Sequence, residues 1–280
     1  MLKGINYWAF PAGSSGNPLH PVEAMRMAKE LGYDCFELTV EQEGPVSLES
    51  SRSAIEQIRK EAEDIGIQLL TLASGVGWSI SPTDPNPDVR KKAVANYRKT
   101  LEIASWLGVE TILYLPGMVS AVFAPEFEPQ RYDLVDQRAR ETLGELVPTA
   151  EKLEIKIGVE NVWSRYLLSP LEMREFIDSF KSPMVGSYFD TGNVVLYGHP
   201  EHWIEILADR IFAVHVKDFR VNVGNLDGFV DILSGDVDFD RVMAALKTIG
   251  YEKTYTAEIV PGMPGCVEKA IAALEVLEQI

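Results

Sequence analysis

Four residues of metal-ligand type lie in the second half of the sequence, and each closes a short apolar run of the kind that forms a buried strand. They are Glu160, Asp190, His215 and Glu258. Helix-like segments separate the four runs, and parallel strands joined by helices bring their C-terminal ends to one face. We therefore expect these side chains to converge on one point, with the composition of a divalent-metal site.

The case for a shared ion depends on the group rather than on any single member. One polar residue at a strand end can simply contact solvent or cap a helix, but four on successive strands favour a common ligand. Neighbouring strands lie about 4.8 Å apart, so their side chains can share one ion. Three carboxylates in a partly buried site also need a cation to remain ionised together. Oxygen-rich ligation with one imidazole suits Mn²⁺, with Mg²⁺, Co²⁺ or Zn²⁺ as alternatives.

The rest of the chain alternates between strand-like and helix-like segments, which predicts a parallel sheet. Eight such units in 280 residues fit a single (β/α)₈ barrel domain, residues 1–280, better than an open doubly wound sheet. No Gly-x-Gly-x-x-Gly follows the first strand, so a dinucleotide fingerprint is absent. The expected strands are 3–10, 35–40, 67–73, 111–115, 156–160, 185–190, 211–215 and 254–258. The expected helices are 22–31, 50–65, 88–107, 132–153, one capped by Ser169, 200–208, one between Asp238 and Gly250, and 267–279.

Composition excludes several classes of partner. The formal net charge of -16 repels phosphate backbones and argues against nucleic acid. No apolar run reaches the roughly 18 residues of a membrane span, and the first residues lack a signal-peptide profile. Two cysteines, Cys35 and Cys266, make no disulfide framework, which favours a reducing cytoplasm.

Four short motifs give the chain a recognisable resemblance. They are Gly158–Asn161 (GVEN), Phe189–Asn193 (FDTGN), His215–Asp218 (HVKD) and Ala257–Ile259 (AEI). In order and strand placement the sequence resembles the sugar-phosphate isomerase/epimerase superfamily with a xylose-isomerase-like barrel, which includes ketose 3-epimerases such as D-tagatose 3-epimerase. The resemblance implies a metal-dependent isomerase acting on a small-molecule sugar or sugar phosphate. It also implies that Glu160, Asp190, His215 and Glu258 bind one metal and that the two glutamates exchange the substrate proton. A homo-oligomer, dimer or tetramer, is left open.

The chemistry of such a site can be stated independently of the resemblance. A metal that holds a ketose carbonyl and the neighbouring hydroxyl acidifies the carbon between them and stabilises an enediolate. Moving that proton needs a carboxylate within hydrogen-bond reach, and inverting the carbon needs one on each face. Glu160 and Glu258 are therefore the expected catalytic pair.

Six further residues are candidates for substrate binding. Lys217 shares a strand side with His215, and Trp8 could stack on a sugar from the first strand. Glu37 ends the second strand and could anchor a hydroxyl or Lys217, while Arg165 could receive a phosphate. Asn193 stands where some epimerases carry histidine. Arg220 lies one place before Val221, where those enzymes carry arginine.

Other functions remain open at this stage. A dehydratase or a hydroxypyruvate-type isomerase could use the same barrel and the same enediolate chemistry. An endonuclease-IV-like phosphodiesterase also uses it but needs several zinc ions, and four histidines with a charge of -16 weigh against that function. A non-catalytic sugar-binding barrel with a structural ion is the alternative outside catalysis. In each case the long loops 74–87, 118–130 and 221–236 are expected around the mouth.

Overall fold

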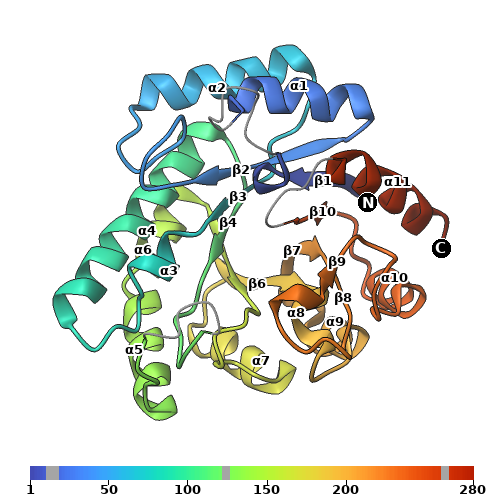
Figure 1. Cartoon of the computed structure of the whole chain (residues 1–280). Coiled ribbons are helices and arrows are strands. Elements are labelled where there is room, and N and C mark those ends of the chain that lie inside the picture. The colour runs from blue at the N-terminus through green and yellow to red at the C-terminus, as the bar shows by residue number, and fades with distance from the viewer. Residues whose placement is uncertain (11–18, 122–126, 260–264) are drawn as a thin grey trace.

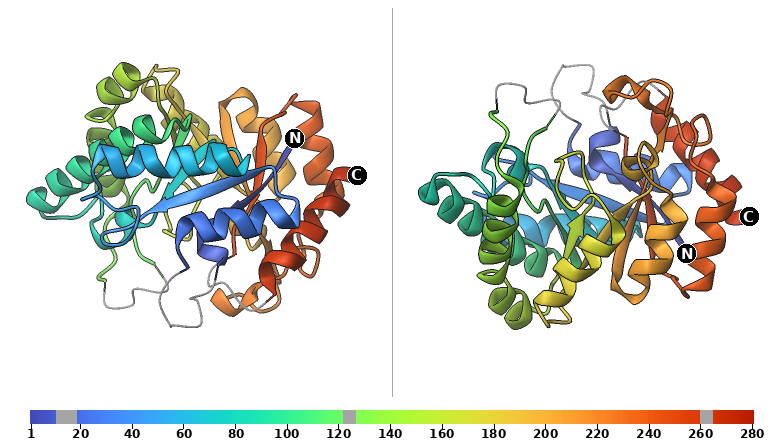
Figure 2. Two further views of the ribbon diagram at one scale, coloured as in Figure 1. Left: turned by 90° about the horizontal axis from the view of Figure 1, so that it is seen from above. Right: turned by 90° about the horizontal axis from the view of Figure 1, so that it is seen from below.

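The computed structural model describes residues 1–10, 19–121, 127–259 and 265–280. Eight parallel strands close into a barrel in the order β1-β10-β7-β6-β5-β4-β3-β2, with helices around the outside (Figures 1 and 2). This confirms the predicted (β/α)₈ barrel. The strands are β1 (Leu2–Asn6), β2 (Cys35–Val40), β3 (Thr71–Ser74), β4 (Thr111–Tyr114), β5 (Lys156–Glu160), β6 (Val185–Asp190), β7 (Ile211–Val216) and β10 (Thr254–Ala257).

The helices that cover the barrel begin and end at residues with clear local signals. Glycines in the left-handed conformation follow α1, α2 and α4, where a side chain would be strained. Ser169 caps α7 by accepting a hydrogen bond from the backbone N–H of Glu172, as its capping-box sequence predicts. The main helices are α1 (Pro21–Leu31), α2 (Arg52–Ile65), α4 (Pro87–Leu107), α5 (Tyr132–Gly144), α6 (Val147–Leu153), α7 (Pro170–Ser179), α9 (Pro200–Leu207), α10 (Phe239–Thr248) and α11 (Cys266–Gln279).

Three expected elements differ from the structure. The strand expected over 67–73 begins only at Thr71 and ends at Ser74. The helix expected over 132–153 is two helices, because Pro148 has no backbone N–H to donate and takes a place in the first turn of a new helix, α6. The strand expected over 3–10 ends at Asn6, whose side chain accepts a hydrogen bond from the backbone N–H of Trp8. That bond turns the chain into a short 3₁₀ helix, η1 (Tyr7–Ala9), which places Trp8 beyond the strand end.

Short elements also form inside connections that were expected to be irregular. They are α3 (Val76–Ser79) after β3, α8 (Gly192–Val195) after β6, η2 (Ala208–Arg210) before β7, and η3 (Leu226–Gly228) with a small antiparallel pair, β8 (Asp218–Phe219) and β9 (Phe229–Val230), after β7. Residues 11–17 are rich in glycine and serine with one proline, which predicts a loop, and they lie outside the described residues, as does part of the loop expected over 118–130.

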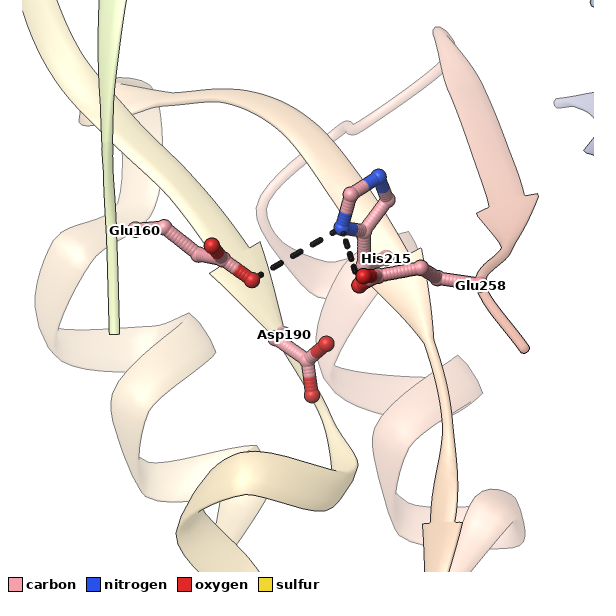
Figure 3. A group of neighbouring side chains, drawn as sticks. All are labelled: Glu160, Asp190, His215 and Glu258. Carbon is pink, nitrogen blue, oxygen red and sulfur yellow. Dashed lines mark ion pairs between the residues drawn. The ribbon is translucent and has the colours of Figure 1, made fainter. Parts of the chain in front are cut away.

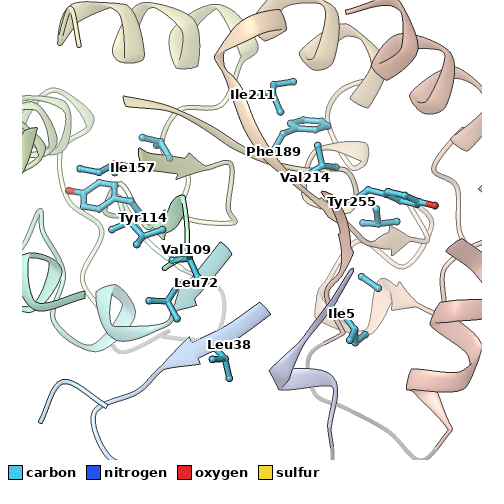
Figure 4. Close-up of a cluster of buried hydrophobic side chains, with 14 of the residues drawn as sticks. Ile5, Leu38, Leu72, Val109, Tyr114, Ile157, Phe189, Ile211, Val214 and Tyr255 are labelled. Carbon is cyan, nitrogen blue, oxygen red and sulfur yellow. The ribbon is translucent and has the colours of Figure 1, made fainter. Parts of the chain in front are cut away.

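Apolar packing divides into an outer layer and an inner layer because successive strand residues point to opposite faces. Phe189 belongs to the large layer between strands and helices, part of which is drawn in Figure 4. Its neighbour Tyr188 belongs to a small cluster inside the barrel, with Leu113 and Val162. Asp190 continues the inward alternation. Within the described part of the chain, no helix has the length and apolar character that crossing a membrane requires.

Candidate metal centre and substrate cavity

The four ligand-type residues meet inside the C-terminal mouth of the barrel. Asp190 and His215 are register partners on β6 and β7, Glu160 ends β5, and Glu258 follows β10. One potential ligand atom from each lies within 4.8 Å of the others (Figure 3). All four side chains are buried. The structure therefore brings together the residues that the sequence singled out for a metal.

The two nitrogens of His215 face different groups. Nδ1 faces the cluster, 2.8 Å from Oε2 of Glu258 and 3.8 Å from Oε1 of Glu160. Nε2 points away from it, as Figure 3 shows, and lies 2.7 Å from Oε1 of Glu37. In metal sites, the ring nitrogen of histidine that does not bind the metal commonly donates its N–H to a carboxylate in this way.

Three buried polar atoms of this group lack a hydrogen bond in the structure. They are Oδ2 of Asp190, Nδ1 of His215 and Oε2 of Glu258. Their close polar neighbours are one another and Lys217, and buried polar atoms in native proteins are nearly always hydrogen-bonded, so three such atoms from three candidate ligands call for a common partner. Oxygen and imidazole donors of this kind suit a divalent ion, so the residues present fit a metal.

Lys217 supplies the nearest positive charge. Its Nζ lies 2.7 Å from Oε2 of Glu258 and 3.2 Å from Oδ2 of Asp190. One ammonium and one imidazole cannot fully offset three close carboxylates. The pKa values of two carboxyls reflect this shortage: burial raises the pKa of Glu160 to about 7, and burial also raises the pKa of Asp190.

Glu258 and His215 show the opposite balance. Burial acts to raise the pKa of Glu258, but the positive charges of Lys217 and His215 outweigh it and hold that pKa well below its usual range. Burial acts to lower the pKa of His215, but the carboxylates of Glu37 and Glu258 outweigh it and raise that pKa well above its usual value. The two glutamates of the proposed pair therefore sit in unlike electrostatic surroundings.

Two asparagines fix the position of Asp190. The Asn161 side chain donates to the Asp190 carbonyl at 2.8 Å and accepts from its backbone N–H at 2.9 Å. The backbone N–H of Asn193 donates to Oδ1 of Asp190 at 2.8 Å, which leaves Oδ2 toward the cluster. The GVEN motif alone does not reveal this role of Asn161. Its place directly after Glu160 was the available signal.

Glu37 lies behind the cluster rather than in the substrate space. Its carboxylate is buried and accepts hydrogen bonds from Tyr188 and Asn6 as well as facing His215. The structure pairs Glu37 with His215 rather than with Lys217, and its anchoring of a substrate hydroxyl stays a prediction. The pleat of β2 turns Glu37 into the barrel interior, where it is buried and does not line the cavity.

A cavity of about 690 Å³ opens above the cluster. Glu160, Asn193, Lys217 and Glu258 line it, and Trp8 lines it as well. Loops 74–87 and 221–236 contribute to its wall as expected, whereas none of the described residues of 118–130 do so. Three aromatic and three acidic residues line the cavity without having been predicted as binding residues from the sequence. They are Trp78, Trp163, Phe229, Glu41, Asp227 and Asp231. Their loop positions were the only signal.

Two arginines expected at the substrate lie elsewhere. Arg165 is exposed and does not line the cavity. Arg220 is also exposed, and its Nε donates to the Ser234 carbonyl at 3.0 Å. Both follow a strand end closely in sequence, but the loop backbone carries each side chain outward. That they contact substrate stays a prediction, which the described cavity wall does not support.

Comparison with known proteins gives a consistent result. A family profile described as xylose isomerase-like TIM barrel matches residues 25–279. An uncharacterized protein of Methanocaldococcus jannaschii is 31% identical over 185 residues, 64% of this chain, and this chain spans only 60% of that protein's length. The L-ribulose-5-phosphate 3-epimerase of Salmonella paratyphi A is 24% identical over 91% of this chain and 86% of its own length.

Solved structures share the fold. A D-tagatose 3-epimerase-like protein superimposes with a TM-score of 0.78 and 23% identity, covering 100% of this chain and 96% of that one. A D-psicose 3-epimerase crystallised with D-fructose gives a TM-score of 0.78 at 19% identity, covering 98% and 90%.

Proposed function

The chain belongs to the xylose isomerase-like TIM barrel family, and on that basis we propose that it is a divalent-metal-dependent isomerase that epimerises a ketose sugar through an enediolate. Glu160, Asp190, His215 and Glu258 hold the ion in this proposal, with Mn²⁺ as the expected metal. The named epimerases among its relatives and structural neighbours support the reaction class. A cytoplasmic location and a homo-oligomer remain predictions.

One observation carries the proposal. Buried ligand atoms of Asp190, His215 and Glu258, from β6, β7 and the end of β10, converge on one point with Glu160, beside a cavity large enough for a sugar. A bound divalent ion would polarise the ketose carbonyl and its neighbouring hydroxyl, which acidifies the carbon between them.

The chain's own residues then handle the proton. Glu160 and Glu258 approach the cluster from different strands, and both line the cavity. One carboxylate removes the proton from the carbon beside the ketone, and the other returns a proton to the opposite face, which inverts that carbon. Lys217 donates to a substrate oxygen, and Asn193 orients Glu160 through its side-chain amide, 3.5 Å from Oε1.

The test is turnover with and without metal. Protein stripped with a chelator should lose epimerisation of free and phosphorylated ketoses, and Mn²⁺ should restore it. In D₂O the product should carry deuterium on the carbon beside the ketone, unless a shielded carboxylate returns the same proton. Turnover that is unaffected by chelation would contradict the proposal, and so would the absence of epimerisation across both panels with metal bound.

A further inference from the structure

The wall of the cavity carries acidic and aromatic side chains. Six lining residues bear carboxylates, whereas Lys217 is the only cationic residue among the lining positions that the structure describes. The carboxylates are those of Glu41, Glu160, Asp218, Asp227, Asp231 and Glu258. Outside the proposed metal site, Glu41, Asp218, Asp227 and Asp231 leave the wall of the space that a substrate must enter negative.

The single cation is already engaged. Lys217 Nζ contacts Glu258 and Asp190, and it lies 5.6 Å from the centre of the Phe229 ring. Lys269 pairs with Asp231 at 2.7 Å but does not line the cavity. Residues 11–18, 122–126 and 260–264 contain no lysine, arginine or histidine in their sequence. A phosphate group in this cavity would meet no uncommitted basic side chain from the described wall.

Aromatic rings face the same space. The half-buried Trp8 and Trp78 both lie beside Gly75, and Trp163 packs against Phe229 with ring centres 5.1 Å apart. The indole N–H groups of Trp8 and Trp163 are held by Glu41 Oε1 at 2.8 Å and the Asn193 carbonyl at 3.0 Å. These bonds fix the rings and leave apolar surface toward the cavity, which suits the C–H face of a sugar.

Resting on the function proposed above, we propose that the substrate is an uncharged ketose whose carbons beyond the reacting end lie against Trp8, Trp78, Trp163 and Phe229. Carboxylates at the rim repel a phosphate ester, so phosphorylated sugars are poor substrates of this enzyme. The selectivity comes from charge at the wall, since the reacting end of both sugars is the same.

Matched pairs of sugars test this. D-fructose is compared with D-fructose 6-phosphate and L-ribulose with L-ribulose 5-phosphate, using the Mn²⁺-loaded protein at low ionic strength. The value of kcat/KM should favour the free sugar by roughly tenfold or more, because the wall carboxylates repel the negative charge of a phosphate ester. The preference should shrink as salt is added, because rim charges are screened. A higher kcat/KM for either phosphate ester overturns the inference.

The double variant Asp227→Asn/Asp231→Asn sharpens the test. Removing the two rim charges should move the free-to-phosphate ratio of kcat/KM toward one, while the control Asp240→Asn, exposed on α10 and outside the cavity wall, should leave the ratio as it was. An unchanged ratio in the double variant would show that these charges do not select the substrate.

Tryptophan fluorescence gives a readout that does not depend on turnover. Quenching on titration with each sugar reports binding beside the indoles. If no sugar is turned over, the proposed function fails, but this inference is still decided: tighter binding of the free ketose supports it, and tighter or equal binding of the phosphate ester refutes it.

Discussion

Glu160 and Glu258 are chemically identical side chains in different surroundings. Glu258 is flanked by Lys217 and His215. Glu160 instead has the side-chain amide of Asn193 at 3.5 Å and the His215 imidazole at 3.8 Å. Burial therefore dominates the pKa of Glu160, and neighbouring cations dominate that of Glu258. Such unlike environments let paired carboxylates take unlike roles in proton transfer.

Replacing either glutamate by glutamine should separate proton transfer from metal binding. Glutamine keeps an oxygen donor and nearly the same shape but cannot act as a base. Turnover should fall by roughly 10²–10⁴-fold in Glu160→Gln and Glu258→Gln. Mn²⁺ measured per protein chain should stay near the wild-type content at saturating metal. The matched control is Glu252→Gln, an exposed glutamate before β10. Near-normal turnover in Glu258→Gln with metal bound would rule out the two-carboxylate mechanism.

Glu37 should act on the metal through His215. Glu37→Gln removes the negative charge beside Nε2 but preserves the size of the side chain. The dissociation constant for Mn²⁺ should rise by roughly 10–100-fold, the usual cost of losing such a partner. Because Glu37 does not line the cavity, kcat at saturating Mn²⁺ should recover. A variant with normal Mn²⁺ affinity and a kcat that stays low would instead place Glu37 in the reaction itself.

At the scale of elements, the sequence predicted the regular helices and strands far better than the short ones. A glycine after the last turn, a proline in the first turn and the Ser169 cap are local sequence signals for helix ends. The bounds of α1, α2, α4 and α7 agree with these signals. α8 and the β8–β9 pair are too short to show a hydrophobic period, so they form through contacts made only in the folded barrel. The outward turn of Arg165 and Arg220 escaped prediction for the same reason.

The connection from β6 into α8 holds the site together. Thr191 Oγ1 donates to the Lys217 carbonyl at 2.8 Å and lies 3.1 Å from the Lys217 backbone nitrogen, which donates to it. Gly192 follows, and a Cβ there would lie 2.7 Å from Lys217 Cβ and 3.0 Å from its carbonyl carbon. Only glycine allows α8 to pack this closely against the end of β7.

Gly192→Ala should therefore damage stability and activity together. Forcing a methyl group against backbone costs about 1–3 kcal/mol of unfolding free energy, and kcat/KM should fall because Asn193 and Lys217 move apart. The control is Gly144→Ala at the end of α5, where an added Cβ meets nothing within 4 Å. That control should be neutral or stabilise by up to about 1 kcal/mol. Equal urea midpoints for the two variants would contradict the close-packing argument.

At the scale of the whole molecule, barrel closure assembles the site from distant parts of the chain. Glu37 from β2 meets His215 from β7 across the interior, a contact that no local pattern encodes. The sequence predicted the convergence of Glu160, Asp190, His215 and Glu258 because parallel strands end on one face. It could not predict which inward residues lie below the cavity and which line it, because that depends on the register between strands. That the chain forms one domain remains a prediction.

Metal binding should raise the stability of the whole barrel. Glu160, Asp190 and Glu258 are buried together, and the strands that carry them form one closed sheet, so their repulsion opposes closure. An ion that binds only the folded chain adds about 2.7 kcal/mol at a hundred times its dissociation constant. For a chain of 280 residues the midpoint of thermal unfolding should rise by roughly 5 °C.

Thermal unfolding with and without Mn²⁺ measures this shift, and His215→Ala provides the contrast. That variant loses the imidazole donor, so its unfolding midpoint should respond to Mn²⁺ only at much higher concentration, where some turnover also returns. Asp240→Asn keeps the cluster intact, alters an exposed acid on α10 and should show the full wild-type shift. If wild type and His215→Ala respond equally to Mn²⁺, the stabilising ion binds elsewhere on this acidic surface, and the four strand-end residues do not form the metal site.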